Sequence, residues 1–148
     1  MVIKKKQAAQ LVHTSETTIR FSEVDSMRIV WHGNYIKFFE DGREAFGKKF
    51  GIGYLDMYAA GLMTPVVEVS CQYKKQLYYG DTVIIETQYI DTDAAKILFH
   101  YNLYRKSDHG LVATGKSVQV FLDKNGELLL TIPDYIIEWK RKYGLLKG

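Results

Sequence analysis

An amphipathic segment between residues 34 and 50 places the strongest limit on the fold of this chain. Large apolar side chains recur there at steps of three and four residues, and charged side chains occupy the remaining positions. The pattern predicts a helix over 34–50 that must bury one face, ended by Gly51 and Gly53. A glycine on the apolar face lets the helix approach its support closely, at a propensity cost of about 1 kcal/mol. That face consists of Tyr35, Phe38, Phe39, Gly42, Phe46 and Phe50.

Beyond Pro65 the pattern becomes that of β-strands. Residues 67–77 alternate between apolar and polar side chains, as expected of a half-buried strand. Three further strand-like segments follow at 82–91, 96–105 and 111–123, separated by groups of turn-forming residues. The spacing predicts antiparallel neighbours, with both faces buried near residues 84 and 118. One clean apolar face is expected in the 96–105 strand, formed by Ile97, Phe99, Tyr101 and Leu103.

The remaining segments complete an α+β fold. Residues 1–15 are polar and irregular, and a short strand is predicted over 17–24. A short helix is predicted over 54–60 and an extended piece over 128–132, and Pro133 opens a terminal helix to about Tyr143. A curled antiparallel sheet packed on one long helix is the expected architecture.

Composition favours one globular domain over residues 1–148. The chain is 47% hydrophobic and 25% charged, the balance of an ordinary compact protein. Its 11 tyrosines raise the aromatic share to 14%, which favours a tightly filled core or an apolar surface kept for another subunit. The net charge of +3 is spread along the chain, so we expect no nucleic-acid partner.

The single cysteine indicates the compartment. Cys71 alone forms neither an intrachain disulfide nor a cysteine zinc cluster, which fits a reducing, cytoplasmic location. Its apolar-facing position predicts a buried packing role rather than a nucleophilic one. Residues 1–12 contain three lysines without a following apolar run, so we expect no secretory signal. No segment has the length and apolar character of a membrane span.

Polar residues that can support chemistry gather between residues 20 and 44, where the first strand leads into the long helix. Backbone N–H groups at a helix start lack intrahelical partners, so a carbonyl placed there can be polarised. Gly33 allows close approach of a substrate, and Asn34 is the expected helix cap. The segment therefore predicts an oxyanion site near Glu23, Asp25, His32, Asn34, Tyr35, Glu40 and Arg43.

These residues resemble the 4-hydroxybenzoyl-CoA thioesterase-like branch of the hotdog-fold acyl-CoA thioesterases. That branch has an aspartate at the end of the first strand, an apolar pair, and His-x-Asn-Tyr opening the helix. The matching positions here are Asp25, Ile29, Val30, His32, Asn34, Tyr35, Glu40 and Arg43, with Gly80-Asp81 resembling the family's turn between strands. The resemblance implies the hotdog fold, a curled antiparallel sheet wrapped around one long helix, and hydrolysis of acyl-CoA or acyl-carrier-protein thioesters.

The resemblance also implies a role for each matched residue. Asp25 acts as general base or nucleophile, and the residue-32 N–H, joined by that of Gly33, holds the thioester carbonyl oxygen while the His32 side chain orients the site. A thiolate leaves readily, so no strong general acid is needed. Substrate-binding roles are expected for Asn34, Tyr35, Arg28 and Glu40. No cofactor is expected other than coenzyme A as part of the substrate.

Arg28 departs from the family pattern, which commonly has glycine three residues after the aspartate. The turn is therefore expected to change shape, with Arg28 pairing either with an anionic part of the substrate or with Asp25. The second pairing would lower the basicity of the carboxylate.

Other interpretations stay open at this point. Asp25 alone would cap a turn, Tyr35 would fill the core, and Glu40 would be a solvated helix residue or reach the site of a neighbouring subunit. A metal site of Asp25, His32 and Glu40 is disfavoured, because the spacing matches no familiar ligand set. The alternative functions are a hydroxyacyl-thioester dehydratase and a non-catalytic acyl-thioester binding module. By analogy with the family, the chain is expected to form a homodimer or homotetramer with the site between subunits.

Overall fold

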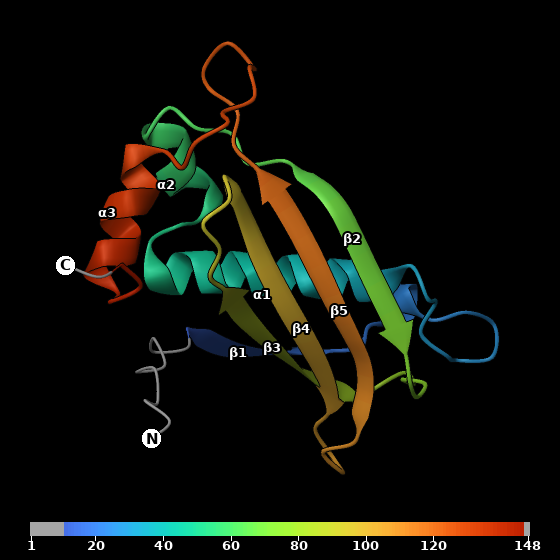
Figure 1. The fold of residues 1–148 in the computed structure, drawn as a ribbon. Coiled ribbons are helices and arrows are strands. Elements are labelled where there is room, and N and C mark those ends of the chain that lie inside the picture. The colour runs from blue at the N-terminus through green and yellow to red at the C-terminus, as the bar shows by residue number, and fades with distance from the viewer. Residues whose placement is uncertain (1–10, 147–148) are drawn as a thin grey trace, which may run out of the picture.

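In the computed structural model, which describes residues 11–146, an antiparallel five-stranded sheet lies against the long helix α1 (Asn34–Phe50), which crosses one of its faces (Figure 1). The strand order across the sheet is β1-β3-β4-β5-β2. The expected α+β architecture, a curled sheet with one long helix, is confirmed. The strands are β1 (Val12–Thr18), β2 (Val66–Tyr73), β3 (Thr82–Ile90), β4 (Lys96–Arg105) and β5 (Leu111–Val120).

The helix packs on the sheet through the aromatic face that the sequence predicts. Phe38, Phe39 and Phe46 are completely buried, and Gly51 ends the helix in the left-handed conformation with φ 77°. A Cβ atom at Gly42 would lie 2.4 Å from the Thr87 hydroxyl, so this glycine permits the close approach of helix and sheet. The predicted reason for Gly42 is confirmed.

Alternation of side chains explains which face of the sheet meets α1. Residues 97, 99, 101 and 103 of β4 are buried as predicted, and residues 83, 85, 87 and 89 of β3 lie on the same inner face. The prediction that β3 and β5 are buried on both sides is wrong. Ile84 and Val118 are only half-buried, because the outer face of the sheet has no covering layer among residues 11–146.

The first strand differs from its predicted bounds. β1 spans Val12–Thr18, so residues 12–15 are not irregular, and the chain then turns through the 3-10 helix η1 (Phe21–Glu23). The strand is held by its ladder with β3, from Val12 opposite Gln88 to Thr18 opposite Thr82. Backbone pairing with β3 defines β1. Polar residues can take part in such pairing as well as apolar ones, so the apolar pattern of the sequence does not reveal where the strand begins and ends. The prediction about residues 1–10 lies outside the described residues.

Strand β2 forms one edge of the sheet. It pairs only with β5 in the part of the chain that the structure describes, and nearly all its side chains are exposed on both faces. The prediction of a half-buried strand over 67–77 is therefore wrong in burial and in length. Cys71 is the exception in β2, since it is half-buried against the core rather than fully buried as expected.

Two short helices close the end of the molecule opposite the blue loop that joins β1 to α1 (Figure 1). They are α2 (Tyr54–Ala59) and α3 (Asp134–Lys142), both close to their predicted bounds. The Lys140 ammonium is buried and donates to the Thr92 carbonyl at 2.6 Å, which ties α3 to the β3–β4 turn. The predicted extended piece at 128–132 is reduced to an isolated bridge between Leu128 and Leu122.

Candidate active site

The carboxylate of Asp25 lies in a tight turn between η1 and α1, not at the end of the first strand. Its Oδ1 accepts hydrogen bonds from the Met27 N–H at 2.8 Å and from the Ile29 N–H at 3.3 Å. The Asp25 N–H donates to the Ile29 carbonyl at 2.9 Å, which closes the turn. The second oxygen, Oδ2, has no hydrogen-bond partner among residues 11–146. The turn thus orients the carboxylate through one oxygen and leaves the other available.

Arg28 completes this turn with φ 64°, in the left-handed region that glycine adopts most readily. The expectation of a turn with a changed shape stays a prediction; arginine here takes a backbone conformation that glycine would adopt readily. The side chain of Arg28 is exposed and forms no ion pair with Asp25 or any other residue in the described range 11–146. Of the two pairings considered for Arg28, the one with Asp25 is therefore not formed within residues 11–146, and the one with the substrate stays a prediction.

The left-handed conformation at Arg28 leads to a stability prediction. The left-handed conformation lowers the folding stability by about 1–2 kcal/mol when the residue has a Cβ atom. Glycine adopts it without that penalty and lowers the stability by only about 0.5–1 kcal/mol, through the extra chain entropy that it loses on folding. We expect Arg28→Gly to be about 1 kcal/mol more stable than Arg28→Ala and at least as stable as the parent. Urea unfolding followed by circular dichroism measures the difference. An alanine variant as stable as the glycine variant would contradict the prediction.

The start of α1 depends on a glycine. Gly33 precedes the helix, and a Cβ atom on it would lie 2.1 Å from the Trp31 ring, so the indole rests directly on this backbone. Trp31 and His32 are both exposed, and their rings lie 4.9 Å apart. The absence of a side chain at Gly33 therefore makes room for the Trp31 ring at the helix start.

Hydrogen bonds to the His32 carbonyl fix the orientation of the peptide bond between His32 and Gly33. The His32 carbonyl accepts hydrogen bonds from the Tyr73 hydroxyl at 2.9 Å and the Tyr35 N–H at 3.3 Å. Since the C=O and N–H of a trans peptide point in opposite directions, the Gly33 N–H points away from these partners. Neither the His32 N–H nor the Gly33 N–H donates to another residue within 11–146. Unpartnered amides at a helix start are suited to bind a developing oxyanion.

A cavity of about 410 Å³ brings the Asp25 turn and the helix start together. Of the predicted site residues, Asp25, His32 and Tyr35 line this cavity. Gly33 does not line it but follows the lining residue His32 in the sequence. Apolar side chains form much of the remaining wall, and two lysines stand at its rim. The lining residues are Asp25, Met27, Ile29, Val30, Trp31, His32, Tyr35, Tyr73, Lys74, Lys75 and Gln76.

Asn34 does not have the expected capping role. Its side chain is buried, and its amide donates to the Glu23 carbonyl at 2.8 Å, while the helix has no side-chain cap. The Trp31 N–H also donates to the Glu23 carbonyl at 3.0 Å. Asn34 thus fastens the loop that carries Asp25 to the helix start, and it is not part of the cavity wall.

Glu40 lies on the exposed side of α1, away from the Asp25 cavity of its own chain. It lines a second cavity, of about 370 Å³, together with Arg43, Thr64, Val66 and Gln119. The two cavities lie at opposite ends of β2, one beside Tyr73 and the other beside Val66. Within one chain, the structure does not bring Glu40 to Asp25.

Tyr73 is a site residue that sequence reasoning missed. It is 49% exposed at the end of β2, contacts the His32 carbonyl, and packs edge-on against Tyr35 at 4.9 Å between ring centroids. In the sequence it is one apolar position in an alternating strand, and only the tertiary placement of β2 beside the helix start reveals its role.

Burial affects two groups near the cavity. Desolvation raises the pKa of the Tyr35 hydroxyl, so it stays protonated and serves as a wall or a hydrogen-bond donor. Desolvation also raises the pKa of the Cys71 thiol, which disfavours the thiolate form. Cys71 is therefore a poor nucleophile, in agreement with the role expected from sequence.

Between residues 11 and 146, no helix has both the length and the apolar character needed to cross a membrane. In the same range, no three histidine, cysteine, aspartate or glutamate side chains group in a way that would hold a metal ion.

A curled sheet around one helix, with a carboxylate and unpartnered amides at the helix start, is the arrangement expected of a hotdog-fold thioesterase. Residues 19–140 match the family model described as the Thioesterase-like superfamily. The chain belongs to this superfamily.

Individual relatives agree with this assignment. The chain is 32% identical over 132 residues to "Putative acyl-CoA thioesterase YneP" of Bacillus subtilis (strain 168), covering 89% of this chain and 95% of that protein. It is 25% identical over 127 residues to the 1,4-dihydroxy-2-naphthoyl-CoA hydrolase of Thermosynechococcus vestitus, covering 84% and 85%. Among solved structures, a DHNA-CoA thioesterase from Staphylococcus aureus superposes with a TM-score of 0.79 at 25% identity, covering 89% of this chain and 88% of that one. The prediction of a hotdog-fold acyl-CoA thioesterase is confirmed.

Proposed function

We propose that this protein hydrolyses acyl-CoA thioesters to the free acid and coenzyme A, with Asp25 as the reacting carboxylate. The observation that carries the proposal is the shared cavity, in which Asp25 faces the same space as the helix start at His32. The names of the relatives support the substrate class.

The chemistry follows from the two sides of the cavity. The thioester carbonyl oxygen accepts hydrogen bonds from the His32 and Gly33 amides, a kind of contact whose loss costs about 3 kcal/mol of barrier. Asp25 Oδ2 then either deprotonates a water molecule that attacks the carbonyl carbon or attacks that carbon itself. The C–S bond breaks and the thiolate leaves. In the second route, water hydrolyses the resulting mixed anhydride and restores the carboxylate.

Release of free thiol from a panel of acyl-CoA and acyl-carrier-protein substrates tests this function. Aromatic, short-chain and long-chain acyl groups are included, and products are identified by mass. A gain of one water per substrate supports hydrolysis, and a loss of one water from a hydroxyacyl substrate indicates a dehydratase instead. Saturable binding without turnover on every substrate indicates a binding module and overturns the proposal.

The exposed edge at β2 supports a homodimer joined through this strand. Val66, Val67 and Val69 are 40%, 59% and 40% exposed, an apolar strip beside unpaired backbone groups. Two copies related by a two-fold axis would pair their β2 strands antiparallel and continue the sheet from one subunit into the other. A second association of two such dimers gives the tetramer expected by analogy.

Such pairing gives Glu40 a role in the proposal. Antiparallel β2 strands place the Tyr73 end of one beside the Val66 end of the other, so the Asp25 cavity of one subunit faces the second cavity of its neighbour. Glu40 and Arg43 then border the acyl group from across the interface. This arrangement supports the substrate-binding role predicted for Glu40, supplied by the neighbouring subunit.

Subunit mixing gives the predicted result for this shared site. Asp25→Asn and Glu40→Gln homodimers are each expected to be weakly active, whereas a heterodimer of the two contains one intact site. Random mixing should therefore restore about a quarter of parent activity, because half the dimers are mixed and each has one good site. Differently tagged subunits, co-expressed and assayed, provide the measurement. No recovery, or a monomeric solution mass, would contradict the shared site.

A further inference from the structure

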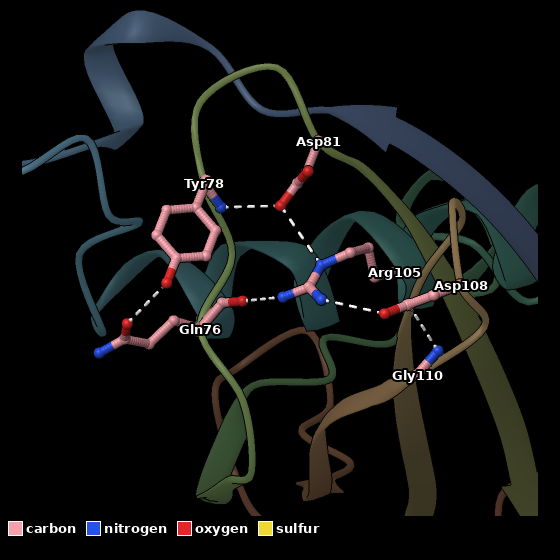
Figure 2. A network of polar contacts seen from close by, with 6 residues as sticks. All are labelled: Gln76, Tyr78, Asp81, Arg105, Asp108 and Gly110. Atoms are coloured by element: carbon pink, nitrogen blue, oxygen red, sulfur yellow. Dashed lines mark hydrogen bonds and ion pairs between the residues drawn. The ribbon is translucent and has the colours of Figure 1, made fainter.

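Arg105 stands at the end of β4 in the centre of a network of polar contacts, shown in Figure 2. Its Nε lies 3.4 Å from Asp81 Oδ2, and its Nη1 donates to Asp108 Oδ2 at 3.2 Å. Its Nη2 donates to the Gln76 carbonyl. The side chain is only 18% exposed, so one largely buried guanidinium joins three segments of the chain.

The same network shapes the loop between β2 and β3. Asp81 Oδ2, which forms the ion pair with Arg105, also accepts a hydrogen bond from the Tyr78 N–H at 2.9 Å, and the Tyr78 hydroxyl donates to the Gln76 side chain at 3.1 Å (Figure 2). Both ends of the segment 76–81 are therefore held by one cation. Arginine suits this position because its planar fork reaches separate acceptors, which a lysine ammonium does not.

This loop is the support of the Asp25 turn. The Val30 N–H donates to the Leu77 carbonyl at 2.8 Å, and the Tyr79 N–H donates to the Arg28 carbonyl at 3.1 Å. Leu77 is completely buried, so the loop is anchored in the core as well as to Arg105. A displacement of the loop would be transmitted to the turn through both hydrogen bonds.

The Asp25 turn then orients the Asp25 carboxylate, since the Ile29 N–H donates to Asp25 Oδ1 at 3.3 Å. We propose that Arg105 is a positioning residue, which fixes loop 76–81 and through it the Asp25 carboxylate. The inference rests on the proposed role of Asp25 as the reacting group. Arg105 does not itself line the cavity, although it donates to the carbonyl of the lining residue Gln76, and it does not contact the substrate in this proposal.

The test compares Arg105→Ala and Arg105→Lys with a matched control at the next residue. Lys106 also forms an ion pair at this end of the sheet, with Glu16 at 3.0 Å, but that pair is exposed and includes no residue of loop 76–81. We expect Arg105→Ala to lower kcat about thirtyfold with KM within about twofold, because a small misplacement of a reacting group has a large effect on rate. Arg105→Lys should recover only part of kcat, and Lys106→Ala should behave as the parent.

Hydrogen exchange separates this inference from the proposed function. In Arg105→Ala, the amides of residues 27–31 should exchange about tenfold faster than in the parent and in Lys106→Ala, while β4 and β5 remain protected. This outcome supports the link to the turn even if no substrate is hydrolysed, in which case only the proposed function fails. Unchanged exchange at 27–31, or full recovery of kcat by lysine, would overturn the positioning role.

Discussion

Replacing Asp25 with asparagine is expected to lower thiol release by about a thousandfold, within the usual range for loss of a general base. Asparagine keeps a side-chain oxygen that can accept from the Met27 and Ile29 amides, so the turn should retain its shape. Loss of rate would then reflect loss of the carboxylate and not local unfolding. Steady-state kinetics on the best acyl-CoA of the panel provides the measurement.

Asp93→Asn is the matched control, because Asp93 is an exposed carboxylate in the β3–β4 turn, remote from the cavity. Its kcat should equal that of the parent. An Asp25→Asn enzyme that keeps its rate would end the proposed mechanism. Rapid quenching followed by mass spectrometry distinguishes the two roles left open for Asp25, since only the nucleophilic route leaves an acyl group on this residue.

Replacing Gly115 with valine is expected to destabilise the fold by about 3 kcal/mol, the upper part of the range for overpacking a core. A Cβ atom at Gly115 would lie 2.3 Å from the Phe39 ring and 3.0 Å from the Ser70 carbonyl. Phe39 cannot easily yield, because it is completely buried and stacks on Tyr101 at 4.7 Å. The melting temperature should fall by about 10 °C, as measured by calorimetry.

A second variant tests whether the stability lost in Gly115→Val comes from the contact with Phe39 of α1. Phe39→Leu removes the ring that the new side chain meets, so the double variant should lose less stability than the sum of the single losses. Thr114→Val, one residue away on the outer face, should change stability by less than about 0.5 kcal/mol. Additive losses in the double variant would show that the contact with Phe39 is not the cause.

Most of the fold could be predicted because its decisive elements carry strong periodicity. The helix over 34–50 and the strand over 96–105 have the bounds and buried faces that their patterns indicate. A first strand was expected, but the bounds of β1 could not be predicted, because it is a polar strand defined by its ladder with β3. The burial of β2 was misjudged for a related reason, since alternation shows which side chains share a face but not whether anything covers it.

The candidate site could be predicted in composition but not in geometry. Resemblance to the family gave Asp25 and His32, and the structure brings them to one cavity. The conformation of Arg28 could not be read from sequence, because a positive φ at a residue other than glycine is set by surrounding contacts. Tyr73 and Arg105 were missed because their contacts join segments far apart in the chain.

The exposed edge strand β2 also affects whether this protein aggregates during expression. Within residues 11–146 β2 pairs only with β5, so a newly folded chain presents unpaired main-chain donors and acceptors next to three exposed valines. Such an edge can template the addition of another extended polypeptide. Glu68 within β2 and Lys74 directly after it are exposed charged residues that can oppose such growth. When the chain is expressed faster than two copies can pair through β2, a larger share of the protein should therefore be insoluble. Neutralising these two charges should increase the insoluble share further.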